Sequence, residues 1–502
     1  MPRQAMSFDL PSIGNLNRSV GSLARQLSQA IRDAIRAGSL KPWELLPSTR
    51  LLAQSLGVSR GTVVEAFEQL IAEGFLESKG RSGTRVARTL NDVAEGHSAR
   101  RRTAASPIVM PASAAAFERI AAEFTSLRGV PFNISVPGAR VSPARIWQKL
   151  GNRIRKQAPA MPAGYSNPQG ALALREAIAE FVRKSRSVHC HAGQVIITAG
   201  TQQGLFLSCQ VLLGPRDHVW VENPAYRGIT AILETMGRED SMIRVPVDVE
   251  GFDVDTAIAR APNATVAFVT PSHQYPLGMP MSMGRRNALL AWARVHGSWI
   301  VEDDYDSELR YAGHPFPSLQ GLDPDRVIYL GTFSKILFPS LRLGYVVVPE
   351  PLVAAFCGAR ALIDKHPPNA EQHVLAAFIA EGHIDRHLRR LRTAYAEQRE
   401  FLITLLQRLL PRRLGWIQPS DQGMHLLLWV AEELDDCEVV RAASTAGVSV
   451  RAVSPMCAEG TRRPGLVLGF GGFANEEMEV AMRHLVSAIR NTARRSHTAP
   501  RR

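Results

Sequence analysis

Residues 331–345 read GTFSKILFPSLRLGY, and this stretch decides the fold of most of the chain. It places one lysine, Lys335, inside an apolar run, with Arg342 seven residues later. A buried ammonium group without a partner is costly. Lys335 is therefore either a chance surface lysine or a reactive amine, and the rest of the sequence has to decide between the two.

The composition describes a globular protein with more than one domain. A chain of 502 residues exceeds one core, and 45% hydrophobic with 21% charged residues excludes a disordered or fibrous class. The net charge of +13 is spread along the chain, so it does not by itself indicate a nucleic-acid-binding end. Five cysteines form no CxxC pair, and no apolar stretch is long enough to span a membrane. We expect a cytoplasmic protein with reduced thiols, because the cysteines form no regular pattern and the start, MPRQAMSFDL, does not have the apolar core of a signal peptide. We expect no metal site.

Four segments differ in their pattern. Residues 20–88 combine short helices with a glycine-punctuated hairpin, and residues 89–125 are rich in Ala, Ser and Arg, as linkers are. Residues 126–490 alternate apolar β-rich runs with helix-length stretches, and residues 491–502 form a basic tail. The Arg100–Arg102 run in the linker either contacts phosphates or is a solvated hinge.

The alternation in the long segment predicts an α/β domain. Its runs lie at 195–198, 218–222, 265–270, 298–303, 327–332 and 343–349. Runs that are apolar on both faces and separated by helices are typical of a largely parallel sheet covered by helices. A long helical stretch, roughly 369–409, then leads to a smaller C-terminal α+β region.

The first segment has the pattern of a winged helix-turn-helix. Ser48 and Ser59 are positioned to cap two short helices around a tight turn at Gly57, and the second helix begins with Arg60 and Thr62. A basic hairpin containing Arg81, Gly83 and Arg85 follows. The second helix would enter the major groove of DNA, with the hairpin along the adjacent backbone.

The string LPSTRLLAQSLGVSRGTVVEAFEQLIAEG resembles the GntR family of bacterial repressors. The resemblance covers residues 20–88 and implies DNA contacts from the start of the second helix and from the wing. The residues expected to contact DNA are Arg50, Ser59, Arg60, Thr62, Arg81 and Gly83. One departure is Trp43, where the family usually has glycine; the alternative is a helical hairpin that serves dimer contacts.

Upstream of the opening stretch lie a carboxylate, a phenol and a turn suited to an anion, which together with the lysine are the parts that a pyridoxal phosphate (PLP) site needs. Asp303 ends an apolar strand, Tyr305 follows two residues later, and TAGTQQGL joins a strand to a helix, a turn that suits an anion. A lysine forms a Schiff base with the cofactor aldehyde, and a carboxylate keeps the ring nitrogen protonated. This combination favours Lys335 as a reactive amine over a chance surface lysine.

Residues 130–490 resemble fold-type I aminotransferases. On that likeness Lys335 is the aldimine lysine, Asp303 the partner of the ring nitrogen and Tyr305 the phenol on the ring hydroxyl. The resemblance further implies a phosphate cup formed by Thr201, Gln202, Thr332 and Arg342. It implies that Tyr226 stacks on the cofactor ring and that Tyr165 contacts the phosphate of the neighbouring subunit.

Two departures from the aminotransferase pattern matter. Tyr275 in TPSHQYPLG stands where an asparagine usually serves the ring hydroxyl, with His273 or Gln274 as possible substitutes. Val467 stands where an arginine usually binds the substrate carboxylate. The arginines that could replace it are Arg227, Arg451, Arg462 and Arg463.

The combination of the two halves is similar to MocR/GabR-type regulators. The resemblance implies a homodimer that binds double-stranded operator DNA and senses an amino compound or a vitamer through an aldimine at Lys335. It implies a regulator and not an enzyme, although a partial transamination half-reaction is compatible with the site. The alternatives are an active aminotransferase with a fused DNA-binding module, and a direct sensor of PLP itself.

Overall fold

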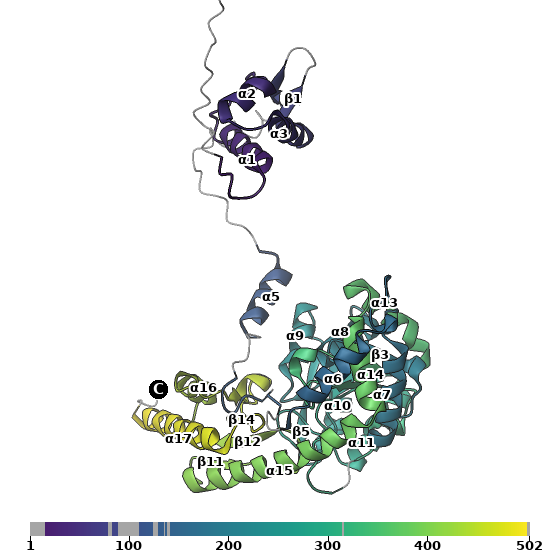
Figure 1. Ribbon diagram of the computed structural model, residues 1–502. Helices are drawn as coiled ribbons and strands as arrows, with labels where there is room; N and C mark the ends of the chain where they lie inside the picture. Colours follow the sequence, from purple (N-terminus) through teal and green to yellow (C-terminus); the bar gives the residue numbers. More distant parts are fainter. Residues whose placement is uncertain are drawn as a thin grey trace, which may run out of the picture. The chain divides into compact units, whose positions relative to one another are not determined.

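The computed structural model describes residues 16–78, 83–88, 110–123, 129–134, 136–137, 141–313 and 316–498. The chain divides into two compact units, Met1–Met110 and Pro111–Arg502 (Figure 1). Within the described residues, no helix has both the length and the apolar character needed to cross a membrane.

The first unit is a winged helix-turn-helix, as the sequence predicts. Its elements are α1 (Leu23–Arg36), α2 (Thr49–Leu56), α3 (Arg60–Ala72) and the antiparallel pair β1 (Leu76–Ser78) and β2 (Thr84–Val86). Leu27 and Ile31 of α1 pack with Val63, Phe67 and Leu70 of α3 in the core, all of them buried. This packing orients the start of α3 away from the core.

Hydroxyl caps start the two helices of the motif. Ser48 Oγ accepts a hydrogen bond from the Leu51 amide, and Ser59 Oγ accepts one from the Thr62 amide. Trp43 has a φ of 66°, so the backbone is left-handed where the resembled family has glycine. The turn therefore keeps its conformation with a tryptophan in it, at a strain of about 1–2 kcal/mol.

The second unit contains an eight-stranded sheet. Its strand order is β3-β10-β9-β8-β7-β4-β5-β6, parallel except that β10 runs antiparallel to β3 and β9, and β6 to β5. The bounds are β3 (Val195–Thr198), β4 (Val219–Asn223), β5 (Met242–Asp248), β6 (Gly251–Phe252), β7 (Val266–Val269), β8 (Trp299–Asp304), β9 (Val327–Thr332) and β10 (Gly344–Val347). All six predicted runs are strands; β5 and β6 were not predicted.

Helices cover both faces of this sheet. Val219 and Val221 of β4 face a cluster with α8, α9 and α13, while Trp220 between them faces a cluster with α10 and α11. The helices of the unit are α5 (Ala112–Glu123), α6 (Ala144–Ile154), α7 (Leu172–Arg186), α8 (Thr201–Leu212), α9 (Arg227–Thr235), α10 (Val254–Arg260), α11 (Met283–His296), α12 (Leu319–Leu322), α13 (Val353–Asp364), α14 (Asn369–Ala380), α15 (His383–Leu409), α16 (Asp436–Thr445) and α17 (Asn475–Thr498).

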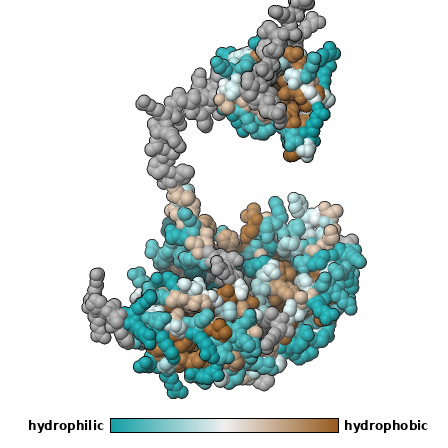
Figure 2. Space-filling view, turned by 60° about the vertical axis from the view of Figure 1, so that its left-hand side comes forward, coloured by the Kyte–Doolittle hydropathy of each residue, from teal (hydrophilic) through white to brown (hydrophobic). Residues whose placement is uncertain are grey.

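A smaller antiparallel sheet forms the C-terminal α+β part, at one end of the unit together with α16 and α17 (Figure 1). Its order is β11-β12-β14-β13. The bounds are β11 (Gly415–Ile417), β12 (His425–Val430), β13 (Arg451–Ala452) and β14 (Gly465–Gly469). The visible face of the whole unit is mostly hydrophilic, as expected when the apolar strands lie inside (Figure 2).

Three predicted boundaries differ from the structure. The stretch 369–409 is two helices, because Gly382 takes a left-handed φ of 68° between α14 and α15. The predicted linker 89–125 contains α5, whose Glu123 pairs with Arg227 of α9. The predicted tail 491–502 begins as the last two turns of α17, which continues to Thr498.

Candidate functional site

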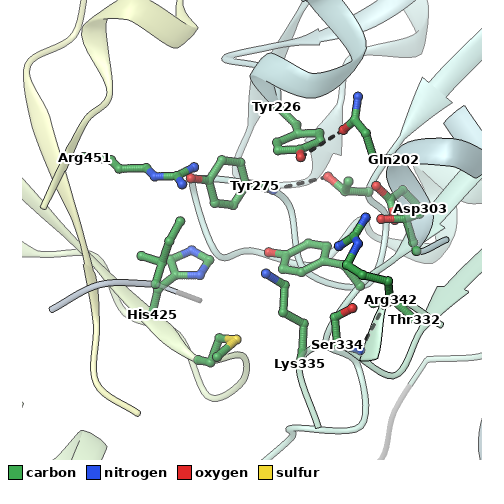
Figure 3. Close-up of a pocket in the computed structure, with 16 residues that line it drawn as sticks. Gln202, Tyr226, Tyr275, Asp303, Thr332, Ser334, Lys335, Arg342, His425 and Arg451 are labelled. Atoms are coloured by element: carbon green, nitrogen blue, oxygen red, sulfur yellow. Dashed lines mark hydrogen bonds between the residues drawn. The ribbon is translucent and has the colours of Figure 1, made fainter. Parts of the chain in front are cut away.

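The carboxyl ends of the parallel strands meet at one edge of the large sheet, where ligands bind in open α/β folds. A cavity of about 270 Å³ lies there, between the large and the small sheet (Figure 3). Eight of the nine predicted cofactor residues line it: Lys335, Asp303, Tyr305, Tyr226, Thr201, Gln202, Thr332 and Arg342. Tyr165 does not, and it is 89% exposed beside His366.

One end of the cavity is built for an anion. Gly200, with a φ of 85°, precedes the first residue of α8, so the helix N-terminus points into the cavity. Arg342 donates a hydrogen bond to the Ala199 carbonyl at 2.5 Å, which holds its guanidinium beside this turn. The Ser334 hydroxyl is buried and has no hydrogen-bond partner among the described residues, so it can donate to a phosphate.

The lysine lies at the floor of the same cavity, with its amine toward the open space (Figure 3). Burial lowers the pKa of Lys335 to about 8; Arg451 acts in the same direction, and Asp306 and Asp303 act against it. A lowered pKa makes more of the neutral amine available at neutral pH, which is the form that attacks a carbonyl.

Asp303 has the environment of a partner for a ring nitrogen. Burial raises its pKa to about 7, and the neighbouring Asp304 acts in the same direction. Its Oδ1 is buried without a hydrogen-bond donor among the described residues. A protonated pyridine nitrogen would supply that donor, so the residues present fit PLP.

An aromatic side chain closes the cavity opposite the lysine. Tyr226 donates its phenol hydrogen to Gln202 Oε1 at 3.0 Å, and Gln202 donates in turn to the Gly228 carbonyl at 3.1 Å. These two bonds fix the ring of Tyr226 over the cavity (Figure 3). A fixed aromatic face suits stacking on a planar ligand.

The small sheet supplies a guanidinium to the opposite wall. Arg451 lies on β13 directly across from Val467 of β14, the position where aminotransferases usually carry an arginine. The cation therefore comes from the adjacent strand. Arg451 lines the cavity beside Tyr275 and forms no ion pair with a described carboxylate.

The other three candidate arginines are occupied away from the cavity. Arg227 pairs with Glu123 and Glu234, each at 2.6 Å. Arg462 donates to the Leu434 carbonyl at 3.0 Å, and the Arg463 guanidinium lies 3.7 Å from the centre of the Trp429 ring. Arg451 is thus the candidate that the structure brings to the cavity.

Several lining residues were not singled out from the sequence, although Gly200, Thr270 and Ser334 lie within the quoted motifs. They are Ile134, Gly200, Thr270, Ser334, Met424 and His425. Tyr275, at the asparagine position, lines the cavity too. Gln274 does not line it, because its amide donates to Glu222 and to two backbone carbonyls.

Four of the predicted DNA-contacting residues gather at the starts of α2 and α3. Arg50, Ser59 and Arg60 are exposed, and the Arg60 guanidinium lies 3.5 Å from the Thr49 hydroxyl, so the two helix N-termini are adjacent. Thr62 is half-buried, and Gly83 is exposed at the start of β2. Arg81 lies outside the described residues.

Comparisons with known proteins agree with both units. Residues 23–86 match the bacterial regulatory proteins of the gntR family, and residues 142–484 match aminotransferase class I and II. The chain is 37% identical to the probable rhizopine catabolism regulatory protein MocR of Rhizobium meliloti, over 93% of each chain. The chain belongs to the MocR family of transcriptional regulators. PLP is the cofactor of its aminotransferase-like unit.

Other members and neighbours of the MocR family support this assignment. The pyridoxine biosynthesis regulator PdxR of Corynebacterium glutamicum is 34% identical over 96% of this chain and 99% of its own. Among solved structures, the α-aminoadipate aminotransferase LysN of Thermus thermophilus superposes with a TM-score of 0.67 at 26% identity, covering 73% of this chain and 94% of its own. The MocR-family regulator therefore combines a DNA-binding unit with an aminotransferase fold.

Proposed function

We propose that this PLP-dependent regulator senses a small amino compound that carries a carboxylate. The observation that carries the proposal is one cavity with a reactive amine on one wall and the guanidinium of Arg451, without a described carboxylate partner, on the other. A guanidinium is suited to bind a carboxylate bidentately. An amino acid would thus be held at both of its ends.

The residues of the large sheet would hold the cofactor. Arg342, Ser334 and the start of α8 would bind its phosphate, and Asp303 would accept a hydrogen bond from its ring nitrogen. When bound, PLP supplies an aldehyde that reacts with amines. Lys335 would hold the cofactor through that aldehyde, and the amine of an effector would compete with the Lys335 amine.

The effector acts on transcription only if it binds two states of the protein unequally. A free Lys335 amine, whose pKa burial lowers to about 8, would take up or lose a proton near neutral pH and so change the charge inside a buried site. Glu123 of α5, near the start of the second unit, pairs with Arg227, the first residue of α9, and Arg227 directly follows the cavity residue Tyr226. We infer that this contact passes the change toward the DNA-binding unit.

The regulator acts as a homodimer in the cytoplasm and binds paired half-sites through α3. Two observations support a dimer: the aromatic side chain of Tyr165 is 89% exposed, and the apolar side chain of Leu362 in the same unit is 90% exposed. Tyr165 would reach the partner's phosphate. Arg50, Ser59, Arg60, Thr62, Arg81 and Gly83 would contact the operator.

The test measures operator binding by fluorescence anisotropy, using DNA from the regulator's own upstream region. The wild-type protein and Lys335→Ala, each loaded with PLP, are titrated with a panel of L-amino acids. We expect at least one amino acid to change wild-type DNA affinity, with no change in Lys335→Ala. An equal response in both proteins would refute sensing through Lys335.

An enzyme is the second candidate, because the cavity also fits the first half of transamination. The same panel, with a 2-oxo acid added, separates the two functions. Sustained turnover of amino acid to oxo acid would favour the aminotransferase. A response to PLP alone, with no amino acid added, would instead favour a direct PLP sensor.

A further inference from the structure

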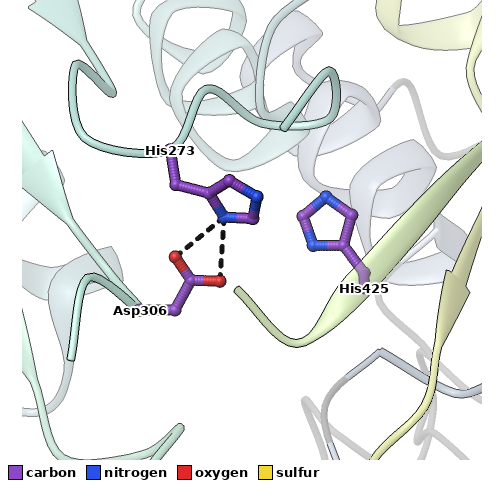
Figure 4. Close-up of side chains that lie close together, drawn as sticks. All are labelled: His273, Asp306 and His425. Atoms are coloured by element: carbon purple, nitrogen blue, oxygen red, sulfur yellow. Dashed lines mark hydrogen bonds and ion pairs between the residues drawn. The ribbon is translucent and has the colours of Figure 1, made fainter. Parts of the chain in front are cut away.

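At the cavity, three buried side chains have polar atoms within 4.8 Å of one another: His273, Asp306 and His425, the last of which lines the cavity (Figure 4). The His273 and Asp306 side chains are 1% and 0% exposed. Both Asp306 oxygens contact the same ring atom, His273 Nδ1, at 2.9 and 3.0 Å. The Tyr305 phenol oxygen also lies 3.0 Å from that nitrogen.

The carboxylate determines where the histidine proton is. An ionised carboxylate only accepts hydrogen bonds, so His273 Nδ1 must carry a hydrogen to satisfy Asp306. An imidazole nitrogen that carries a hydrogen gives its lone pair to the ring, and therefore it cannot accept the phenol hydrogen of Tyr305. The logic is that of a buried aspartate that fixes the tautomer of a catalytic histidine.

The phenol hydrogen of Tyr305 is consequently directed elsewhere. The phenol oxygen contacts His273 at a nitrogen that carries a hydrogen, and the Tyr305 side chain lines the cavity. Burial raises the pKa of Tyr305 well above its usual value, so the phenol keeps its hydrogen at neutral pH. That hydrogen is left to donate into the cavity.

The chain has made room for this arrangement at Gly423. A Cβ there would lie 1.9 Å from His273 Cε1 and 2.8 Å from Asp306 Oδ2, distances that no side chain tolerates. The third member of the cluster, His425, donates through Nε2 to the Pro276 carbonyl at 3.3 Å. Burial keeps the pKa of His425 well below its usual value. A neutral His425 leaves Asp306 as the group that selects the tautomer.

We propose that Asp306 and His273 are positioning residues that fix the direction of the Tyr305 hydrogen bond toward the ring oxygen of the cofactor. The inference rests on the proposed function, since it needs a cofactor joined to Lys335. A hydrogen bond donated to that oxygen withdraws charge that would otherwise hold a proton on the adjacent Lys335 nitrogen. Tyr305 thereby lowers the pH at which that proton leaves.

The experiment follows the visible absorption of the PLP-loaded full chain as a function of pH. The midpoint of this pH titration is the pH at which half of the Lys335 nitrogens joined to the cofactor have lost their proton. We expect Tyr305→Phe to raise this midpoint by about one pH unit, the size of effect that one hydrogen bond to a charged group has. Asp306→Asn should raise it in the same direction, because an amide both donates and accepts and no longer selects the tautomer. In the Tyr305→Phe background, Asp306→Asn should give no further rise.

The sign of the change separates this proposal from a simple charge effect. Asp306 raises the pKa of the Lys335 amine, so loss of its charge alone would lower the midpoint. An unchanged or lowered midpoint in Asp306→Asn would overturn the proposal, as would a stoichiometric metal ion in the purified protein. Asp306→Ala serves as a second variant, and Glu308→Gln, which removes a buried carboxyl that does not contact His273, should show no rise. Failure of the wild type to show a lysine-dependent band would instead refute the proposed function.

Discussion

Replacement of Arg451 by glutamine tests the recognition of the effector. Arg451 is half-buried, lines the cavity and forms no ion pair with a described carboxylate. A hydrogen bond to a charged group contributes about 1.5–3 kcal/mol, and partial exposure weakens a bidentate pair. We therefore expect a loss of about 2–3 kcal/mol, which is roughly a 30- to 150-fold weaker affinity for an amino acid effector.

The assay compares the best amino acid from the panel with its decarboxylated amine. Both are titrated against the absorption of the PLP-loaded protein. Arg451→Gln should weaken binding of the amino acid and leave the amine almost unchanged. The comparison is needed because Arg451 also lowers the pKa of Lys335, an effect that acts on both ligands alike.

A matched control is available on the same segment. Arg463 is also an arginine of the small subdomain, but its guanidinium lies over Trp429 and outside the cavity. Arg463→Gln should leave both affinities as they are. If Arg451→Gln weakened the amine as much as the amino acid, or if Arg463→Gln matched it, Arg451 would not be the carboxylate site.

Three further predictions concern other parts of the chain. Ser59→Ala removes the cap on the Thr62 amide and should destabilise the DNA-binding unit by about 1 kcal/mol in chemical denaturation; no change would show that the cap is dispensable. Because burial lowers the pKa of Lys335 to about 8, the neutral amine increases as pH rises through 8, and the rate of PLP loading into stripped protein should rise there and level off above it. A rate that increases only near pH 10 would contradict this. Glu123→Gln breaks a partly exposed pair with Arg227, so hydrogen exchange in α5 should accelerate by no more than about fivefold, and a much larger change would mean that other contacts depend on it.

The fold of the large unit was predictable from its sequence because the apolar pattern of each strand agrees with the place of that strand in the sheet. Runs such as 195–198 and 327–332 are apolar on both faces, which fits a strand buried between two layers of helices. Strand β5 was missed because Arg244 and Pro246 interrupt its apolar pattern, and its residues are largely half-buried. Only its last two residues pair with the short edge strand β6, so the rest of β5 is itself exposed as an edge. An edge strand has weaker constraints on composition than a central one.

The site was predictable where residues stand at strand ends and unpredictable where they come from the small sheet. Asp303 and Thr332 end neighbouring strands, so parallel order alone brings them together. Arg451 and His425 reach the cavity only through the pairing of β12, β13 and β14. Four arginines were therefore equivalent in the sequence, and strand register distinguishes them.

The cavity has a consequence that concerns rigidity. Lys335 follows a strand of the eight-stranded sheet, whereas Arg451 belongs to the four-stranded sheet. A molecule joined to the first wall and ion-paired with the second is a crosslink between two otherwise separate sheets. We expect the two sheets to unfold in one cooperative step when the cavity is filled, and more independently when it is empty. Filling the cavity would then make the second unit more rigid. A change in rigidity can be transmitted through a short helix such as α5 without any large displacement.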